Sequence, residues 1–136
     1  MAVFLSSLYN TNVNAETIFM IRPLEFSGDL RFLDQTRLPT EEVWVEARDL
    51  DTVCEAIRLL RIRGAPLIGV AAAYGAWIGV RGTRANDRAE FLRELDGVAA
   101  KLISTRPTDV NLKKGVDFVT SAVLASSEKQ PPALVD

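Results

Sequence analysis

The sequence predicts an α+β fold, in which a small antiparallel N-terminal sheet is followed by a bundle of about four helices. In three short segments between residues 24 and 48, apolar side chains recur at every second position, as they do in half-buried strands. From Asp49 onward the apolar spacing changes to the 3.6-residue period of a helix. Strands and helices are thus segregated along the chain, which is the pattern typical of this fold class.

The strand region begins with a predicted hairpin. Apolar and polar residues alternate over residues 24–26 and again over residues 30–32, and Ser-Gly-Asp at residues 27–29 is a turn sequence between them. A second turn is expected at Pro39, and alternation resumes over residues 42–48. These segments predict an antiparallel meander of about three strands.

The first two predicted helices meet at a glycine. Asp49 is the expected N-cap of the first, and Gly64 is expected to end it in the manner of a C-terminal glycine. Pro66 suits the first turn of the second helix, which continues to Val80. Because this second helix is apolar on all sides, we expect it at the centre of the core.

Two amphipathic helices complete the predicted bundle. Asn86 is the expected N-cap of the third helix, which Pro107 ends. The fourth carries an apolar stripe from Leu112 to Val123 and ends at Pro131-Pro132. The resulting domain organisation is a weakly ordered leader over residues 1–19, a domain over residues 20–130 and a frayed tail over residues 131–136.

Composition excludes several kinds of chemistry and partner. The 136 residues include no histidine and one cysteine, so this chain holds no Ser-His-Asp triad, no HExxH zinc site and no Cys-x-x-Cys cluster. A net charge of −2 is unlike the basic surface of a nucleic-acid-binding protein. The uncharged stretch over residues 64–80 is shorter than a membrane span and rich in glycine. A free cysteine and no export signal predict a cytoplasmic protein.

The first candidate site is Arg63-Gly64-Ala65, directly before Pro66. A helix N-terminus offers unpaired N–H groups and a partial positive charge, both of which attract phosphate or carboxylate. Gly64 allows a ligand to approach the backbone, and the Arg63 guanidinium is suited to an oxyanion. The alternative interpretation is a plain helix–turn–helix joint in which glycine and proline serve geometry alone.

The second candidate site is Arg106, which again stands beside a first-turn proline. Its alternative interpretation is an ordinary capped helix start with Thr108 as the N-cap. Two arginines at two helix starts favour one shared anionic ligand. Cys54 lies on an apolar helical stripe and is interpreted as a core residue. No spacing of carboxylates indicates an acid–base pair.

Four blocks of sequence carry a resemblance to a known family. They are residues 21–26, 33–39, 62–75 and 105–112, and the longest reads IRGAPLIGVAAAYG. In order and spacing these blocks closely resemble the N-terminal domain of the S-methyl-5-thioribose-1-phosphate isomerase family. That family belongs to a superfamily that includes the regulatory subunits of translation initiation factor 2B.

The resemblance implies a metal- and cofactor-independent aldose–ketose isomerase of methionine salvage. It would convert 5-methylthioribose 1-phosphate into 5-methylthioribulose 1-phosphate, and the full-length family forms homodimers. The implied substrate-binding residues are Arg63, Gly64, Ala65 and Arg106. Leu67 departs from the alanine usual in the family and adds volume beside them.

The resemblance also implies that this chain lacks a reaction centre. The family's catalytic cysteine and aspartate lie in a C-terminal Rossmann-like domain that no part of this sequence matches, and Cys54 is in the wrong segment to replace that cysteine. We therefore expect a truncated copy, inactive alone, that holds the phosphosugar-binding residues only. The alternatives are a ribose 1,5-bisphosphate isomerase and a regulatory binding module like the initiation factor 2B subunits.

Overall fold

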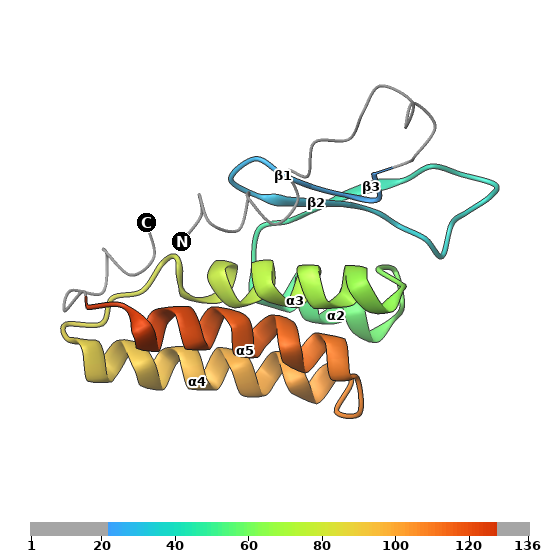
Figure 1. The fold of residues 1–136 in the computed structure, drawn as a ribbon. Coiled ribbons are helices and arrows are strands. Elements are labelled where there is room, and N and C mark those ends of the chain that lie inside the picture. The colour runs from blue at the N-terminus through green and yellow to red at the C-terminus, as the bar shows by residue number, and fades with distance from the viewer. Residues whose placement is uncertain (1–21, 128–136) are drawn as a thin grey trace, which may run out of the picture.

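A computed structural model describes residues 22–127 of the chain and confirms the α+β class. Three antiparallel strands form one sheet in the order β1 (Leu24–Phe26), β2 (Leu30–Leu33) and β3 (Trp44–Ala47). Leu24 pairs with Phe32, and Phe32 pairs in turn with Val45. The sheet covers one side of a layer of helices (Figure 1). The predicted meander is therefore present.

Four helices follow within the described part of the chain: α2 (Leu50–Arg58), α3 (Ala65–Val80), α4 (Arg88–Thr105) and α5 (Val110–Ala125). In Figure 1, α2 and α3 lie nearest the sheet, with α4 and α5 beyond them. The central helix is α3, which packs against each of the other three. Most of its side chains are buried, as its uniformly apolar sequence predicts.

Aromatic side chains join the sheet to α3. Phe26 stacks on Tyr74 with ring centroids 4.3 Å apart, and it meets Trp77 edge-on at 5.2 Å. Such pairs contribute beyond their buried area because of the ring quadrupoles. The sheet is therefore held over the middle and the C-terminal part of α3.

The ends of the first two helices differ from the sequence prediction. The first helix ends at Arg58, well before Gly64, and Leu60 adopts a positive φ of 56° in the connection that follows. Gly64 is instead the N-cap of α3, where its φ is 97°. The glycine therefore begins a helix rather than ending one, and the turn out of α2 is made by a leucine.

Aspartates cap the other three described helices. Asp49 is the N-cap of α2 as predicted, and its carboxylate accepts a hydrogen bond from the Thr52 N–H at 2.8 Å. For α4 and α5 the predicted caps, Asn86 and Thr108, are each one residue too early. The actual caps are Asp87 and Asp109, which accept hydrogen bonds from the N–H groups of Glu90 and Leu112.

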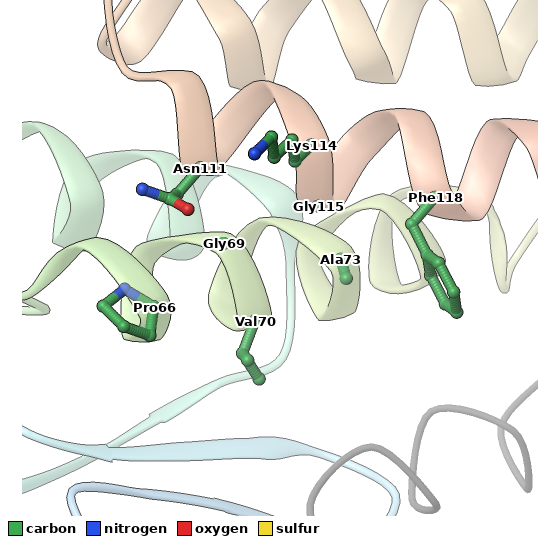
Figure 2. Close-up of a pocket in the computed structure, with 8 residues that line it drawn as sticks. All are labelled: Pro66, Gly69, Val70, Ala73, Asn111, Lys114, Gly115 and Phe118. Carbon is green, nitrogen blue, oxygen red and sulfur yellow. The ribbon is translucent and has the colours of Figure 1, made fainter.

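Helices α3 and α5 approach closely because glycines face each other. A β-carbon at Gly115 would lie 2.0 Å from the Gly69 carbonyl oxygen, and one at Gly69 would lie 2.8 Å from the Asn111 carbonyl oxygen. The two helices run side by side in the same direction, so that their N-terminal ends are neighbours (Figure 2). This packing brings the two predicted sites to one end of the helical layer.

Parts of the predicted domain organisation lie outside the described residues. These are the leader over residues 1–19, the tail over residues 131–136 and the Pro131-Pro132 helix stop; the domain predicted over residues 20–130 is described from 22 to 127. Between residues 22 and 127, no helix has the length and apolar character needed to cross a membrane.

Candidate anion-binding site

The start of α3 is open to a ligand. Arg63, Gly64 and Ala65 are exposed. A β-carbon at Gly64 would meet no atom within 4 Å, so space lies beside this backbone. Its φ of 97° is in the left-handed region that side chains disfavour, which explains why glycine occupies the position.

The first turn of α3 has few hydrogen-bond acceptors near it in the described part of the chain. Pro66 has no N–H, and the N–H groups of Ala65 and Leu67 have no acceptor among residues 22–127. Gly64 provides no side-chain cap, and the first turn contains no acidic residue. The other three described helices each place an aspartate at this position. Only α3 in this part of the chain therefore leaves its N-terminal positive charge without a carboxylate.

Arg63 borders a pocket beside this helix start. The pocket has a volume of about 370 Å³ and is lined by Pro23, Gln35, Arg63, Pro66, Leu67 and Val70. The Gln35 Nε2 donates a hydrogen bond to the Arg63 carbonyl oxygen at 3.3 Å. Arg63 forms no ion pair with any other described residue. Arg63 therefore lines this pocket and has no carboxylate partner among residues 22–127.

A buried carboxylate, which the sequence analysis did not select, holds the segment before Arg63. Asp34 is 3% exposed and accepts hydrogen bonds from Arg61 Nε at 2.7 Å and from the Thr36 hydroxyl and N–H at 2.6 and 3.0 Å. Burial acts to raise the pKa of Asp34, but the hydrogen bonds from Thr36 and Arg61 outweigh it and lower the pKa. The sequence signal that could have singled out Asp34 is its place in the block over residues 33–39, one of the four that carry the family resemblance.

Arg106 has a different environment from Arg63. It is the C-cap of α4, and its Nε lies 3.5 Å from an Asp109 carboxylate oxygen, within the range of an ion pair. That Nε is nevertheless buried without a hydrogen-bond partner among the described residues. Because Asp109 also caps α5, the second helix start already has its own carboxylate. The two helix starts are therefore not equivalent.

The structure brings the two arginine-containing connections to the same end of the helices (Figure 1). Pro66 at the start of α3 and Asn111 at the start of α5 line a common pocket of about 210 Å³. Figure 2 shows these two residues at one end of that pocket and Phe118 at the other. The sequence indicated a shared ligand, and this arrangement places the helix starts of Arg63 and Arg106 at the same end.

The other groups considered are Cys54, as a nucleophile, and the side chains that could act as metal ligands. Cys54 is buried, and burial is the main cause that raises the pKa of its thiol, as expected for a core cysteine. Within residues 22–127, no group of three or more His, Cys, Asp or Glu side chains is placed to hold a metal ion.

The chain is an α+β domain in which an exposed arginine lies beside a helix N-terminus, an arrangement that can bind an anion. Residues 61–133, just over half of the chain, match the initiation factor 2 subunit family. The chain therefore belongs to that family.

Relatives of the chain include an enzyme and a translation factor. A methylthioribose-1-phosphate isomerase from Syntrophotalea carbinolica is 50% identical over 93 residues, covering 68% of this chain and 27% of the relative. The 5-methylthioribose 1-phosphate isomerase structure from Pyrococcus horikoshii has a TM-score of 0.78 and 29% identity, covering 86% of this chain and 33% of that one. A structure of translation initiation factor eIF-2B, subunit delta, from A. fulgidus has a TM-score of 0.75 and 32% identity, covering 85% and 34%. The chain thus spans about a quarter to a third of these relatives.

Proposed function

We propose that the chain is the phosphosugar-binding N-terminal part of an isomerase that converts 5-methylthioribose 1-phosphate into 5-methylthioribulose 1-phosphate. The relatives named methylthioribose-1-phosphate isomerase support this proposal. The observation that carries it is the N-terminus of α3, where the described residues supply no acceptor for two N–H groups and no capping carboxylate, and where Arg63 is exposed.

In this proposal the phosphate of the substrate occupies the position that a capping carboxylate has in the other helices. Its oxygens accept hydrogen bonds from the Ala65 and Leu67 N–H groups and from the Arg63 guanidinium. The Arg106 side chain, whose Nε lies 3.5 Å from an Asp109 carboxylate oxygen, adds positive charge in the connection between α4 and α5. A phosphate fixed in this way holds the sugar in position, which lowers the entropic part of the reaction barrier.

The chemical step itself requires groups that we place outside these 136 residues. The one thiol, Cys54, is buried, and the family resemblance places the catalytic cysteine and aspartate in a C-terminal domain that this sequence does not match. We therefore expect binding without turnover from this chain alone. We further expect the complete isomerase to be a cytoplasmic homodimer that uses neither metal nor organic cofactor.

A second candidate function is a regulatory binding module. The similarity to the translation factor subunit favours it, because that structure is almost as close as the enzyme. The two functions differ in what they require of the α3 N-terminus. A module that acts only through protein contacts has no need of phosphosugar affinity, whereas the isomerase part depends on it.

Calorimetric titration of the purified chain with 5-methylthioribose 1-phosphate tests the proposal. We expect saturable binding that weakens by about tenfold or more in Arg63→Ala, because a hydrogen bond to a charged group contributes about 1.5–3 kcal/mol. Arg106→Ala is expected to weaken binding in the same direction. Ribose 1,5-bisphosphate serves as the competing ligand and reports which sugar phosphate the site prefers.

The matched control is Arg93→Ala. Arg93 is also an exposed arginine, but it lies in the first half of α4, about 20 Å along the helix from Arg106. This variant is expected to bind like the unmodified chain. Equal affinity in all three arginine variants, or no binding by the unmodified chain, would reject the anion-binding role.

A further inference from the structure

The connection between α2 and α3 is anchored to the chain segment that follows β2. The Arg61 Nε donates to the buried Asp34 carboxylate at 2.7 Å, and the Gln35 N–H donates to the Arg61 carbonyl oxygen at 2.9 Å. Ile62 is fully buried, and its N–H donates to the Ala56 carbonyl oxygen at 3.2 Å. The backbone just before Arg63 is therefore held from two sides.

Gln35 reaches one residue further. Its side-chain Nε2 donates to the Arg63 carbonyl oxygen at 3.3 Å, so Gln35 contacts this connection with both its backbone and its side chain. Gln35 also lines the pocket that Arg63 borders. The Arg63 side chain, in contrast, forms no ion pair with another residue of the described part. The backbone of Arg63 is fixed while its guanidinium is left for a ligand.

Such an arrangement favours binding because the connection is ordered before the ligand arrives. A mobile loop would lose conformational entropy when the ligand binds, and the free-energy cost of that loss would weaken the affinity. Support of a binding residue by neighbouring hydrogen bonds avoids this cost.

We propose that Asp34 and Gln35 are positioning residues that hold the Arg61–Gly64 connection so that the Arg63 guanidinium faces a phosphate group bound at the open N-terminus of α3. The inference rests on the proposed phosphosugar function and adds the residues that make its site rigid. Asp34 acts through Arg61, and Gln35 acts through the backbone of Arg63.

The test is Gln35→Met, which keeps the length of the side chain and removes its N–H donor. We expect affinity for 5-methylthioribose 1-phosphate to fall by about threefold to tenfold in calorimetry, because the Arg63 side chain and its connection must then be ordered when the ligand binds. The melting temperature is expected to stay within about one degree of the unmodified chain, because the bond is partly exposed. Thr40→Ala is the matched control, since it removes a bond from the Thr40 hydroxyl to the Arg37 carbonyl oxygen in the same loop.

A double variant separates positioning from general stability. Where Arg63 is already alanine, Gln35→Met is expected to reduce affinity by less than about twofold, because the guanidinium it positions is gone. A general structural effect would instead reduce affinity by the same factor in both backgrounds, and that result would overturn the inference.

The outcomes also distinguish this inference from the proposed function. If Arg63→Ala weakens binding but Gln35→Met matches Thr40→Ala, the inference is wrong and the phosphosugar function stands. If the unmodified chain does not bind the phosphosugar, both are wrong.

Discussion

Gly64 is the N-cap of α3 and has an unusual backbone conformation. Its φ of 97° and the empty space where a β-carbon would lie are both shared by Gly28 in the β1–β2 turn, where φ is 95°. The two glycines therefore impose the same backbone requirement at two different places. Only Gly64 is next to the proposed phosphate position. Comparing alanine substitutions at the two glycines therefore separates the effect of backbone strain on stability from the effect on ligand affinity.

We predict that Gly64→Ala and Gly28→Ala each lower the free energy of unfolding by about 1–2 kcal/mol, because alanine is strained at positive φ. Urea unfolding measures this change. Only Gly64→Ala is expected also to weaken phosphosugar binding in calorimetry. Equal affinities in the two variants would contradict a site at the α3 N-terminus.

The ionisation of Asp34 makes the free energy of unfolding depend on pH. Burial acts to raise its pKa, but the hydrogen bonds from Thr36 and Arg61 lower the pKa below the ordinary value of 3.8. The ionised form is thus favoured in the folded state, and its contribution is complete above the unfolded pKa. That contribution is lost as the pH falls through the folded pKa.

We predict that Asp34→Asn lowers the melting temperature at pH 7 and flattens its decline below about pH 4, because asparagine does not titrate. Thermal unfolding followed by circular dichroism between pH 7 and 2.5 measures both effects. Asp117→Asn is the control, because Asp117 pairs with Lys113 where both side chains are exposed. A pH profile of Asp34→Asn parallel to that of the unmodified chain would contradict this role.

At the scale of elements, the α3–α5 contact sets where the two helix N-termini lie. The contact is close because Gly69 and Gly115 have no side chain between the two backbones. Gly97 in α4 offers a comparison, since a β-carbon there would meet no atom within 4 Å. The α3–α5 packing therefore requires glycine at positions 69 and 115, whereas no contact among the described residues requires glycine at position 97.

We predict that Gly115→Ala lowers the free energy of unfolding by about 3 kcal/mol, because its β-carbon would lie 2.0 Å from a backbone oxygen and the helices must separate. Gly97→Ala is expected to raise stability by about 0.5–1 kcal/mol through helix propensity. Urea unfolding of both variants measures the difference. Similar stabilities would show that α3 and α5 are not packed this closely.

Periodicity predicted the elements better than their ends. The three strands and the positions of the helices follow from apolar spacing, which each element repeats locally. The early end of α2 does not, because it depends on Leu60 at positive φ and on the Arg61 contact with Asp34, 27 residues earlier in the chain. The caps were missed by one residue because Asn86 and Thr108 are themselves acceptable cap types.

Local sequence likewise predicted one part of the candidate site and not the rest. Arg63 and Gly64 stand next to a helix-starting proline, so local sequence indicates an anion-binding position there. Gln35 is 28 residues from Arg63, and no local pattern reports that hydrogen bond. The Asp109 carboxylate beside Arg106 was likewise not anticipated, and it makes the second helix start unlike the first.

At the scale of the whole molecule, the chain spans about a quarter to a third of relatives that include a named isomerase. We predict that the purified chain binds 5-methylthioribose 1-phosphate but gives no detectable 5-methylthioribulose 1-phosphate. Product formation followed by ³¹P NMR checks this expectation. Turnover that Arg63→Ala abolishes would place the reaction centre within these residues and contradict our assignment of the chemical step elsewhere.

The central claim is that the open N-terminus of α3 holds a phosphate. The most direct measurement is a titration of the ¹⁵N-labelled chain with 5-methylthioribose 1-phosphate, followed by amide chemical shifts. We predict the largest shifts at the Ala65 and Leu67 N–H groups and at the Arg63 Nε–H, and no response to the same sugar without phosphate. Shifts confined to the groove between α3 and α5, or no shifts at Ala65 and Leu67, would contradict the claim.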